Sequence, residues 1–176
     1  KNIKNVGNLK FCETKKNLSK NYKEKISPIL KNKKILFCAL STHEGEEIFC
    51  AKLHKTLRKK SKDFITIIIP RHVERSKEII KQLENMHLNV HSHKSREKLN
   101  SKCDIYLVDT YGETKKFLKI SKIAFLGGSI IDHRGHNPFE AVRLGCRVIH
   151  GPHISNHLAL IKTCAHASTI ASASSE

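Results

Sequence analysis

The chain of 176 residues is long enough for one domain with a substantial core and short for two. Its 33 Lys and Arg against 16 Asp and Glu give a formal charge of +17, which favours anionic partners such as nucleotides, phospholipid surfaces or nucleic acid. No apolar run approaches the ~20 residues of a membrane-spanning helix, so any membrane association is expected to be peripheral or to involve another part of the protein.

The two ends of the chain predict a piece of a larger protein. The chain begins at Lys1 without a methionine and closes on a run of small residues. Residues 1–33 are polar and lysine-rich, and they predict an N-terminal segment with a short helix near 17–25. Residues 165–176 predict a frayed or truncated tail.

Between these ends, residues 34–164 alternate apolar strand-like runs with helical patterns. The predicted strands are 35–40, 64–69, 88–91, 104–108, 123–126 and 147–150. The predicted helices are 46–60, 76–86, 114–120 and 155–164, with one more starting at Asn137. This alternation requires right-handed crossovers, and it predicts an α/β domain with a Rossmann-like parallel sheet and helices on both faces.

The six cysteines contain no CxxC pair, and Cys38, Cys103 and Cys146 lie in or beside apolar runs. This placement is typical of buried reduced thiols and indicates neither a zinc site nor a disulfide framework. A reducing cytoplasmic setting is therefore expected.

Neither a dinucleotide nor a metal is expected. The first strand exit lacks the G-x-G-x-x-G sequence of NAD-binding folds. Twelve histidines raise the question of a metal, and His91 with His93 or His150 with His153 have suitable spacing. Carboxylates and cysteines do not cluster at matching spacings, however, so the sequence predicts no metal and no cofactor.

A glycine turn follows the strand predicted at 123–126. Gly127 and Gly128 allow a sharp turn and would bring bare backbone N–H groups close to a ligand. A phosphate group could bind there, with Ser129 beside it. The alternative is an ordinary structural connection in an α/β protein.

A helix start follows this turn. Asn137 is a good N-cap, Pro138 suits the first helical position, and Glu140 stands three residues after the cap, where it could close a capping box. The positive end of this helix would face the glycines. The same signals would also mark a well-capped helix without a ligand.

In a parallel sheet the loops that leave the carboxyl ends of the strands meet at one edge. Their polar residues suit a phosphorylated ligand that carries hydroxyl groups. Arg71 could bind a phosphate or a sugar carboxylate, or could be a surface arginine. Glu140 could accept hydrogen bonds from a ribose diol, whereas a helix cap is the favoured role for Glu113. His43 and His136 could act as donors, but isolated loop histidines more often have packing roles.

Seven segments in this order resemble the C-terminal half of the 3-deoxy-D-manno-octulosonic acid (Kdo) transferases. The resemblance covers about Val6 to His157, and its most specific parts are Ser-Thr-His-Glu-Gly-Glu-Glu and His-Asn-Pro-Phe-Glu. The segments are 7–11, 41–47, 70–72, 109–113, 125–129, 135–140 and 151–153.

The resemblance implies the donor-binding domain of a GT-B glycosyltransferase. Such an enzyme would transfer Kdo from its substrate CMP-Kdo to a lipid A precursor in lipopolysaccharide biosynthesis, at the cytoplasmic face of the bacterial inner membrane. The other domain, N-terminal in this family, would hold the acceptor site and the general base. The present chain is therefore expected to be soluble, to have no catalytic residue of its own and to be inactive alone.

By the same resemblance, two groups of residues would form the CMP-Kdo site. The substrate-binding residues would be Pro70, Arg71, Tyr111, Gly112, Glu113, Asn137, Pro138, Phe139 and Glu140. Accessory positions would be Ser41, His43, Gly127, Gly128, Ser129 and His136. The chain departs from the family in having Tyr111 where Met is usual and one glycine instead of two in 133–136. After His157 the resemblance stops.

Two other functions stay open. A different GT-B enzyme that uses a UDP-sugar would share the architecture and a ribose-binding glutamate. A basic nucleic-acid-binding module would account for the charge, although RNP-type aromatic motifs are absent and the chain has only three Tyr and no Trp for stacking.

Overall fold

The computed structural model describes residues 35–158, 161 and 170–172. The segment expected at 1–33, with its short helix, lies outside the described residues.

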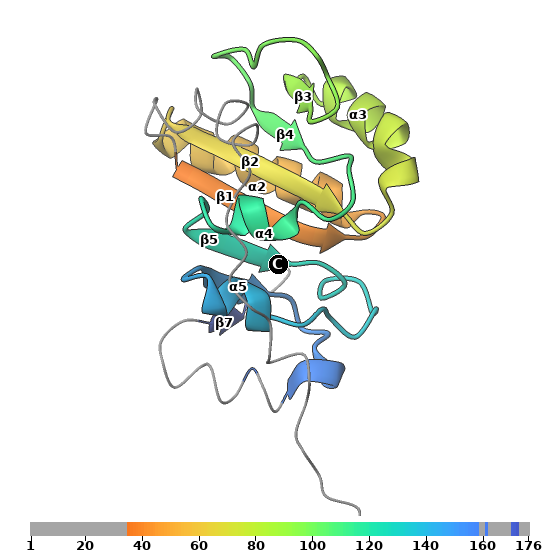
Figure 1. Cartoon of the computed structure of the whole chain (residues 1–176), viewed down its shortest axis with the longest axis vertical. Coiled ribbons are helices and arrows are strands. Elements are labelled where there is room, and N and C mark those ends of the chain that lie inside the picture. Colours follow the sequence, from red (N-terminus) through yellow and green to blue (C-terminus); the bar gives the residue numbers. More distant parts are fainter. Residues whose placement is uncertain (1–34, 159–160, 162–169, 173–176) are drawn as a thin grey trace, which may run out of the picture.

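Seven strands form one sheet in the order β3-β4-β2-β1-β5-β6-β7 (Figure 1). Every strand pairing is parallel, which confirms the predicted Rossmann-like sheet. The first strand lies near the centre, between β2 and β5. The strands are β1 (Ile35–Thr42), β2 (Phe64–Pro70), β3 (Val90–Ser92), β4 (Ile105–Leu107), β5 (Ile123–Leu126), β6 (Arg147–His150) and β7 (Ile170–Ser172).

Helices cover both faces of the sheet, as predicted. Figure 1 shows α4 and α5 in front of the strands and α2 behind them. The helices are α2 (Glu46–Lys60), α3 (Ser76–Asn85), α4 (Thr114–Leu118) and α5 (Phe139–Arg143), with 3-10 turns η2 (Val73–Arg75) and η3 (Ser155–His157). None of the helices in the described part of the chain has the length and apolar character needed to cross a membrane.

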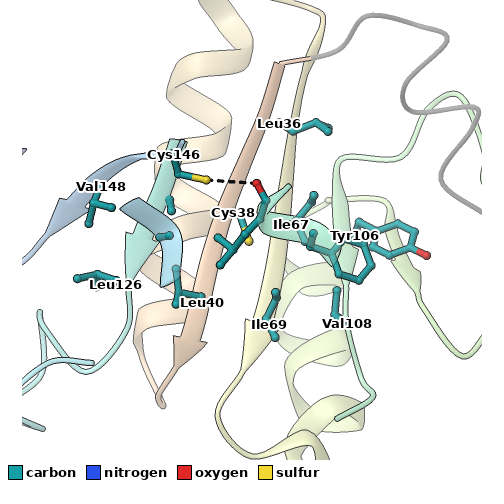
Figure 2. Close-up of a cluster of buried hydrophobic side chains, with 14 of the residues drawn as sticks. Leu36, Cys38, Leu40, Ile67, Ile69, Tyr106, Val108, Leu126, Cys146 and Val148 are labelled. Carbon is teal, nitrogen blue, oxygen red and sulfur yellow. Dashed lines mark hydrogen bonds between the residues drawn. The ribbon is translucent and has the colours of Figure 1, made fainter. Parts of the chain in front are cut away.

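Two separate cores follow from the alternation of side chains along the strands. On β1, Leu36, Cys38 and Leu40 pack with residues of α4 and α5, as Figure 2 shows for the strand side of this cluster. Phe37 and Ala39 point the other way and pack with residues of α2 and α3. Because both faces are covered, β2 is buried at every position, which accounts for its continuous apolar sequence.

The described cysteines are free and buried, as predicted. The Cys146 thiol donates to the carbonyl oxygens of Leu118 at 3.2 Å and Ser121 at 3.3 Å. Burial raises the pKa of Cys146 to about 11 and raises the pKa of Cys38 and Cys50 further. These groups are therefore neutral thiols at physiological pH. Cys12 and Cys164 lie outside the described residues.

The C-terminal region differs from the prediction. The tail expected over 165–176 contains β7, whose backbone pairs with β6 through Val148 and Ile170, so these three residues belong to the sheet and are not frayed. The helix predicted over 155–164 begins as the 3-10 turn η3, and most of its remainder lies outside the described residues.

Candidate ligand-binding site at the carboxyl edge of the sheet

The order of the strands places a topological switch point between β1 and β5. From β1 the chain passes to β2 on one side, and it later reaches β5 on the other. In open parallel sheets, ligands bind where the loops from such neighbouring strand ends separate. Figure 1 shows the ends of β1 and β2 at the same edge as the loop that follows β5.

A buried carboxylate links the loops after β1 and β5. The carboxylate of Glu46 accepts hydrogen bonds from the backbone N–H groups of Gly128 at 2.7 Å, Ser129 at 3.1 Å and Ile130 at 3.1 Å. It also accepts from the N–H of His43 at 2.9 Å. The side chain is completely buried. Glu46 therefore fills the place that the sequence predicted for a phosphate.

This contact corrects the roles predicted for the glycine turn. The N–H groups of Gly128 and Ser129 are not bare, because Glu46 occupies them. The N–H of Gly127 donates to Leu40 O at 2.8 Å, within the sheet edge. The hydroxyl of Ser129 donates to Leu126 O and accepts from Gly151 N, so it joins β5 to the β6 exit. These residues support the site and have no donor left for a phosphate.

The glycine at position 127 is required by a close approach within the chain itself. A Cβ there would lie 2.1 Å from the carbonyl oxygen of Ser41. Ser41 lies at an irregularity in the pairing of β1, between Leu40 and Thr42, and has a φ of +53°. The predicted close backbone approach is therefore real, but the partner is β1 and not a ligand. Ser41 accordingly shapes the strand exit.

Four histidines gather at this edge from three loops. The Nε2 atoms of His43 and His136 are 3.0 Å apart, which is a hydrogen bond between two rings of which one is the donor. The His133 ring stacks on His43 with centroids 4.1 Å apart, and the His72 ring lies edge-on to His43 at 6.1 Å. We call His43, His72, His133 and His136 the histidine cluster. Within the described residues, no group of three or more His, Cys, Asp and Glu side chains is arranged to hold a metal ion.

The two hydrogen-bonded imidazoles resist protonation. Burial, followed by the neighbouring His133 and His136, lowers the pKa of His43 to about 4. Burial and then the charge of Arg71 lower the pKa of His136. Both rings are neutral near pH 7, so they can donate or accept a hydrogen bond but carry no charge for a phosphate.

A pH dependence of stability follows from His43. Its pKa of about 4 in the folded chain lies below the value of 6.5 for a free histidine, so the unfolded chain binds more protons between these values. We expect the contribution of His43 to the free energy of unfolding to be largest above pH 6.5 and to fall as the pH falls toward 4. The variant His43→Gln should show a shallower slope in urea titrations over this range. An unchanged slope would contradict the assignment.

The loop after β2 contains a positively charged residue, Arg71. Arg71 is exposed, and its backbone N–H donates to Thr42 O at 2.9 Å, which fixes the start of its side chain beside the β1 exit. No carboxylate among the described residues pairs with its guanidinium group. Arg71 also acts electrostatically on His136. The group is therefore available for an anionic ligand beside the histidine cluster. Pro70, which precedes it, is buried and ends β2.

The loop after β4 carries an exposed aromatic ring and a carboxylate. Tyr111 is 68% exposed, and its hydroxyl donates to Glu74 at 3.1 Å. Gly112 has a φ of +79°, a conformation that favours glycine. Glu113 stands at the N-cap of α4 but makes no side-chain cap hydrogen bond. Its carboxylate instead pairs with Lys116 at 2.8 Å, so the favoured capping role is wrong.

The helix α5 begins at Phe139 with Pro138 at the N-cap position, one residue later than predicted, and among the described residues Glu140 closes no capping box. Asn137 Oδ1 accepts from the N–H of Phe139 at 2.9 Å, and Pro138 already has helical dihedral angles. Glu140 Oε1 lies 3.5 Å from Lys115 Nζ, and this pair connects α5 to α4. The side chain of Glu140 is 37% exposed, so a ligand can reach it.

The structure thus brings the predicted residues to one edge in two groups. Arg71, His43 and His136 lie around the exits of β1, β2 and β5. The residues 111–113 and Glu140 lie around the starts of α4 and α5. No role was predicted for Glu46. Its position, directly after a glycine and in the first turn of a helix, was a usable signal, because backbone N–H groups there can bind a carboxylate.

Comparison with known proteins was made by sequence and by structure. No protein-family model matches the chain. It is 34% identical over 161 residues to the 3-deoxy-D-manno-octulosonic acid transferase of Rickettsia bellii, covering 92% of the chain and 38% of the relative. It is 33% identical over 169 residues to a probable mitochondrial enzyme of that name from Arabidopsis thaliana, covering 93% and 38%. The Haemophilus influenzae enzyme of that name is 32% identical over 133 residues, covering 76% and 31%.

One solved structure has the same fold. The C-terminal CMP-Kdo binding domain of WaaA from Acinetobacter baumannii superposes with a TM-score of 0.77 at 24% identity, over 88% of this chain and 80% of that domain.

The parallel sheet and its switch point define a Rossmann-like α/β domain, with a candidate ligand-binding site at the carboxyl edge. The chain spans about a third of the length of the curated relatives it matches. It is a homologue of the Kdo transferases, which are glycosyltransferases.

Proposed function

We propose that this chain is the donor-binding domain of a glycosyltransferase that moves Kdo from CMP-Kdo to a lipid A precursor. The observation that carries the proposal is the similarity to Kdo transferases over about nine tenths of the chain. The fold shared with a CMP-Kdo binding domain supports it. Arg71, which has no carboxylate partner among the residues that the structure describes, lies beside the switch point and supplies a group suited to a nucleotide phosphate.

The proposed chemistry is attack by an acceptor hydroxyl on the anomeric carbon of Kdo, with CMP as the leaving group. Negative charge then grows on the departing phosphate, and Arg71 would stabilise it. Glu140 would accept hydrogen bonds from the ribose, and Tyr111, Gly112 and Glu113 would line the cytidine pocket. Asn137, Pro138 and Phe139 would position the first turn of α5 beside the nucleotide. His43 and His136, neutral near pH 7, would serve as hydrogen-bonding groups.

Loss of either proposed contact should weaken CMP binding. Arg71→Ala removes a charge-assisted hydrogen bond and is expected to weaken binding about tenfold or more. Glu140→Ala is expected to weaken it by about fivefold through lost ribose contacts. Calorimetric titration with CMP measures both effects. Lys77→Ala and Glu84→Ala, at exposed positions of α3, are the matched controls. Unchanged affinity in both site variants would remove Arg71 and Glu140 from the site.

The rival functions differ in the ligand they select. Titration with CMP, UMP and UDP, followed by NMR, separates a CMP-sugar enzyme from a UDP-sugar enzyme, and a preference for UDP would remove the Kdo assignment. A nucleic-acid-binding module predicts RNA affinity that tolerates changes of sequence and falls steeply with salt.

We further propose that the intact enzyme works at the cytoplasmic face of the inner membrane and uses no metal or other cofactor. The acceptor site and the general base would come from the other domain, so this chain alone would bind the donor without turnover. Its positive charge suits anionic lipids and a phosphorylated acceptor. EDTA should leave the activity of the intact enzyme unchanged, and activity lost to EDTA and restored by zinc would overturn the metal-free scheme.

A further inference from the structure

A cavity lies at the amino edge of the sheet, opposite the candidate ligand-binding site. It has a volume of about 510 Å³ and is bounded by the last turns of α2 and by the segments that lead into β3 and β4. The charged and titratable residues that matter for its chemistry are His54, Lys55, Arg58, Lys59, Lys102 and Asp104.

The single carboxylate among these residues is already neutralised within the chain. Asp104 forms an ion pair with Arg58. Its Oδ2 atom also accepts from the backbone N–H and the side-chain amide of Asn89, at 2.8 and 2.9 Å. Asp104 therefore links Arg58 to Asn89, and its negative charge is already paired with Arg58.

Three lysines also line the cavity. Lys55 and Lys59 are exposed on α2, one turn apart, and Lys102 is exposed on the facing segment before β4. None of the three ammonium groups has a carboxylate partner in the part of the chain that the structure describes. Three cations around one hollow create a positive potential that favours a multiply charged anion.

A buried imidazole adds a hydrogen-bonding group to the lining. His54 is completely buried, and its Nδ1 lies 3.0 Å from Thr66 Oγ1. Its Nε2 has no hydrogen-bond partner among the described residues and lies 3.6 Å from Asp104 Oδ1. Burial and then the charge of Arg58 lower the pKa of His54 to about 4, so the ring is neutral. In the tautomer in which Thr66 donates to Nδ1, Nε2 is a donor.

From these groups we propose that the cavity binds a phosphate group, with Lys55, Lys59 and Lys102 as its charged contacts. The phosphate can belong to a small soluble molecule or to a lipid headgroup, since both present the same anion to the three ammonium groups. This site is separate from the nucleotide site and does not depend on its assignment.

The test is an NMR titration of the 176-residue chain with inorganic phosphate at constant ionic strength. We expect saturable shifts of the Leu88, Asn89 and Lys102 amides. The double variant Lys55→Gln with Lys59→Gln should weaken this binding about tenfold. The control is Lys77→Gln with Lys81→Gln, which makes the same charge change on exposed positions of α3 and should leave the affinity unchanged.

A second arm identifies the source of the phosphate. Co-sedimentation with phosphatidylglycerol–phosphatidylcholine vesicles, compared with pure phosphatidylcholine, would assign a lipid headgroup if Lys55 and Lys59 are required and free phosphate gives no shift. Equal weakening in the two double variants would overturn the proposal, because only net charge would then matter. Absence of both localised shifts and lysine-dependent vesicle binding would also overturn it. CMP titration of the same variants should be unaffected, which keeps this result apart from the nucleotide site.

Discussion

Replacing Glu46 by Ala is expected to lower the free energy of unfolding by about 3–5 kcal/mol. The carboxylate accepts four backbone hydrogen bonds from two loops that are more than 80 positions apart in the sequence. Its removal leaves the N–H groups of His43, Gly128, Ser129 and Ile130 without their acceptor in a buried place. A buried donor without a partner costs more than the net value of the bond it loses.

Urea denaturation measures this effect, with two variants for comparison. Glu46→Gln keeps one acceptor oxygen and should give an intermediate loss of stability. Glu44→Ala removes an exposed carboxylate two positions earlier and should change stability by less than about 0.5 kcal/mol. If Glu46→Ala were as stable as Glu44→Ala, the loops after β1 and β5 would not depend on this carboxylate.

Gly127→Ala is expected to destabilise the chain by about 2–4 kcal/mol. The added Cβ would lie 2.1 Å from Ser41 O and 2.7 Å from the Cα of Thr42. Both atoms belong to the backbone of β1, so relief of the overlap must move a central strand against its neighbour. The thermal unfolding temperature and urea titration report the loss.

Gly112→Ala is the matched control. It tests the cost of the backbone conformation alone, whereas Gly127→Ala tests the steric overlap of the added Cβ. A Cβ at Gly112 would meet nothing within 4 Å, but the φ of this residue is +79°. The cost there should be about 1 kcal/mol, from the left-handed conformation alone. A larger loss at Gly112 than at Gly127 would show that the β1–β5 approach relaxes easily and would contradict the steric argument.

The sequence predicts the elements of this fold well where the signal is local. The bounds of α2, β5 and β6 match the predicted ranges, since periodic apolar residues and flanking turn residues determine them. The hydrogen bond from Phe139 N to Asn137 Oδ1 forms because the two residues are only two positions apart. The strand β7 was missed because its three residues, in a run of small side chains, are strand only through pairing with β6.

The location of the site could be predicted from the sequence, but the contacts between its residues could not. Parallel topology alone brings the strand-end loops to one edge, so the locations of Arg71 and Glu140 could be inferred. The hydrogen bond between His43 and His136 joins residues 93 positions apart, and the one from Gly128 to Glu46 spans 82. No local pattern encodes such pairs. Glu113 likewise prefers Lys116 to the backbone because an opposite charge lies one turn away.

The buried carboxylate of Glu46 also determines how an anion would be recognised at this edge. Many phosphate-binding loops bind their ligand through backbone N–H groups. Here the N–H groups of Gly128, Ser129 and Ile130 already donate to Glu46. Under the proposed function, the phosphate of the nucleotide would therefore be bound by exposed side chains at this edge, among them the guanidinium of Arg71. Salt screens the contacts of an exposed cation, so the proposed affinity for a nucleotide should fall as the ionic strength rises.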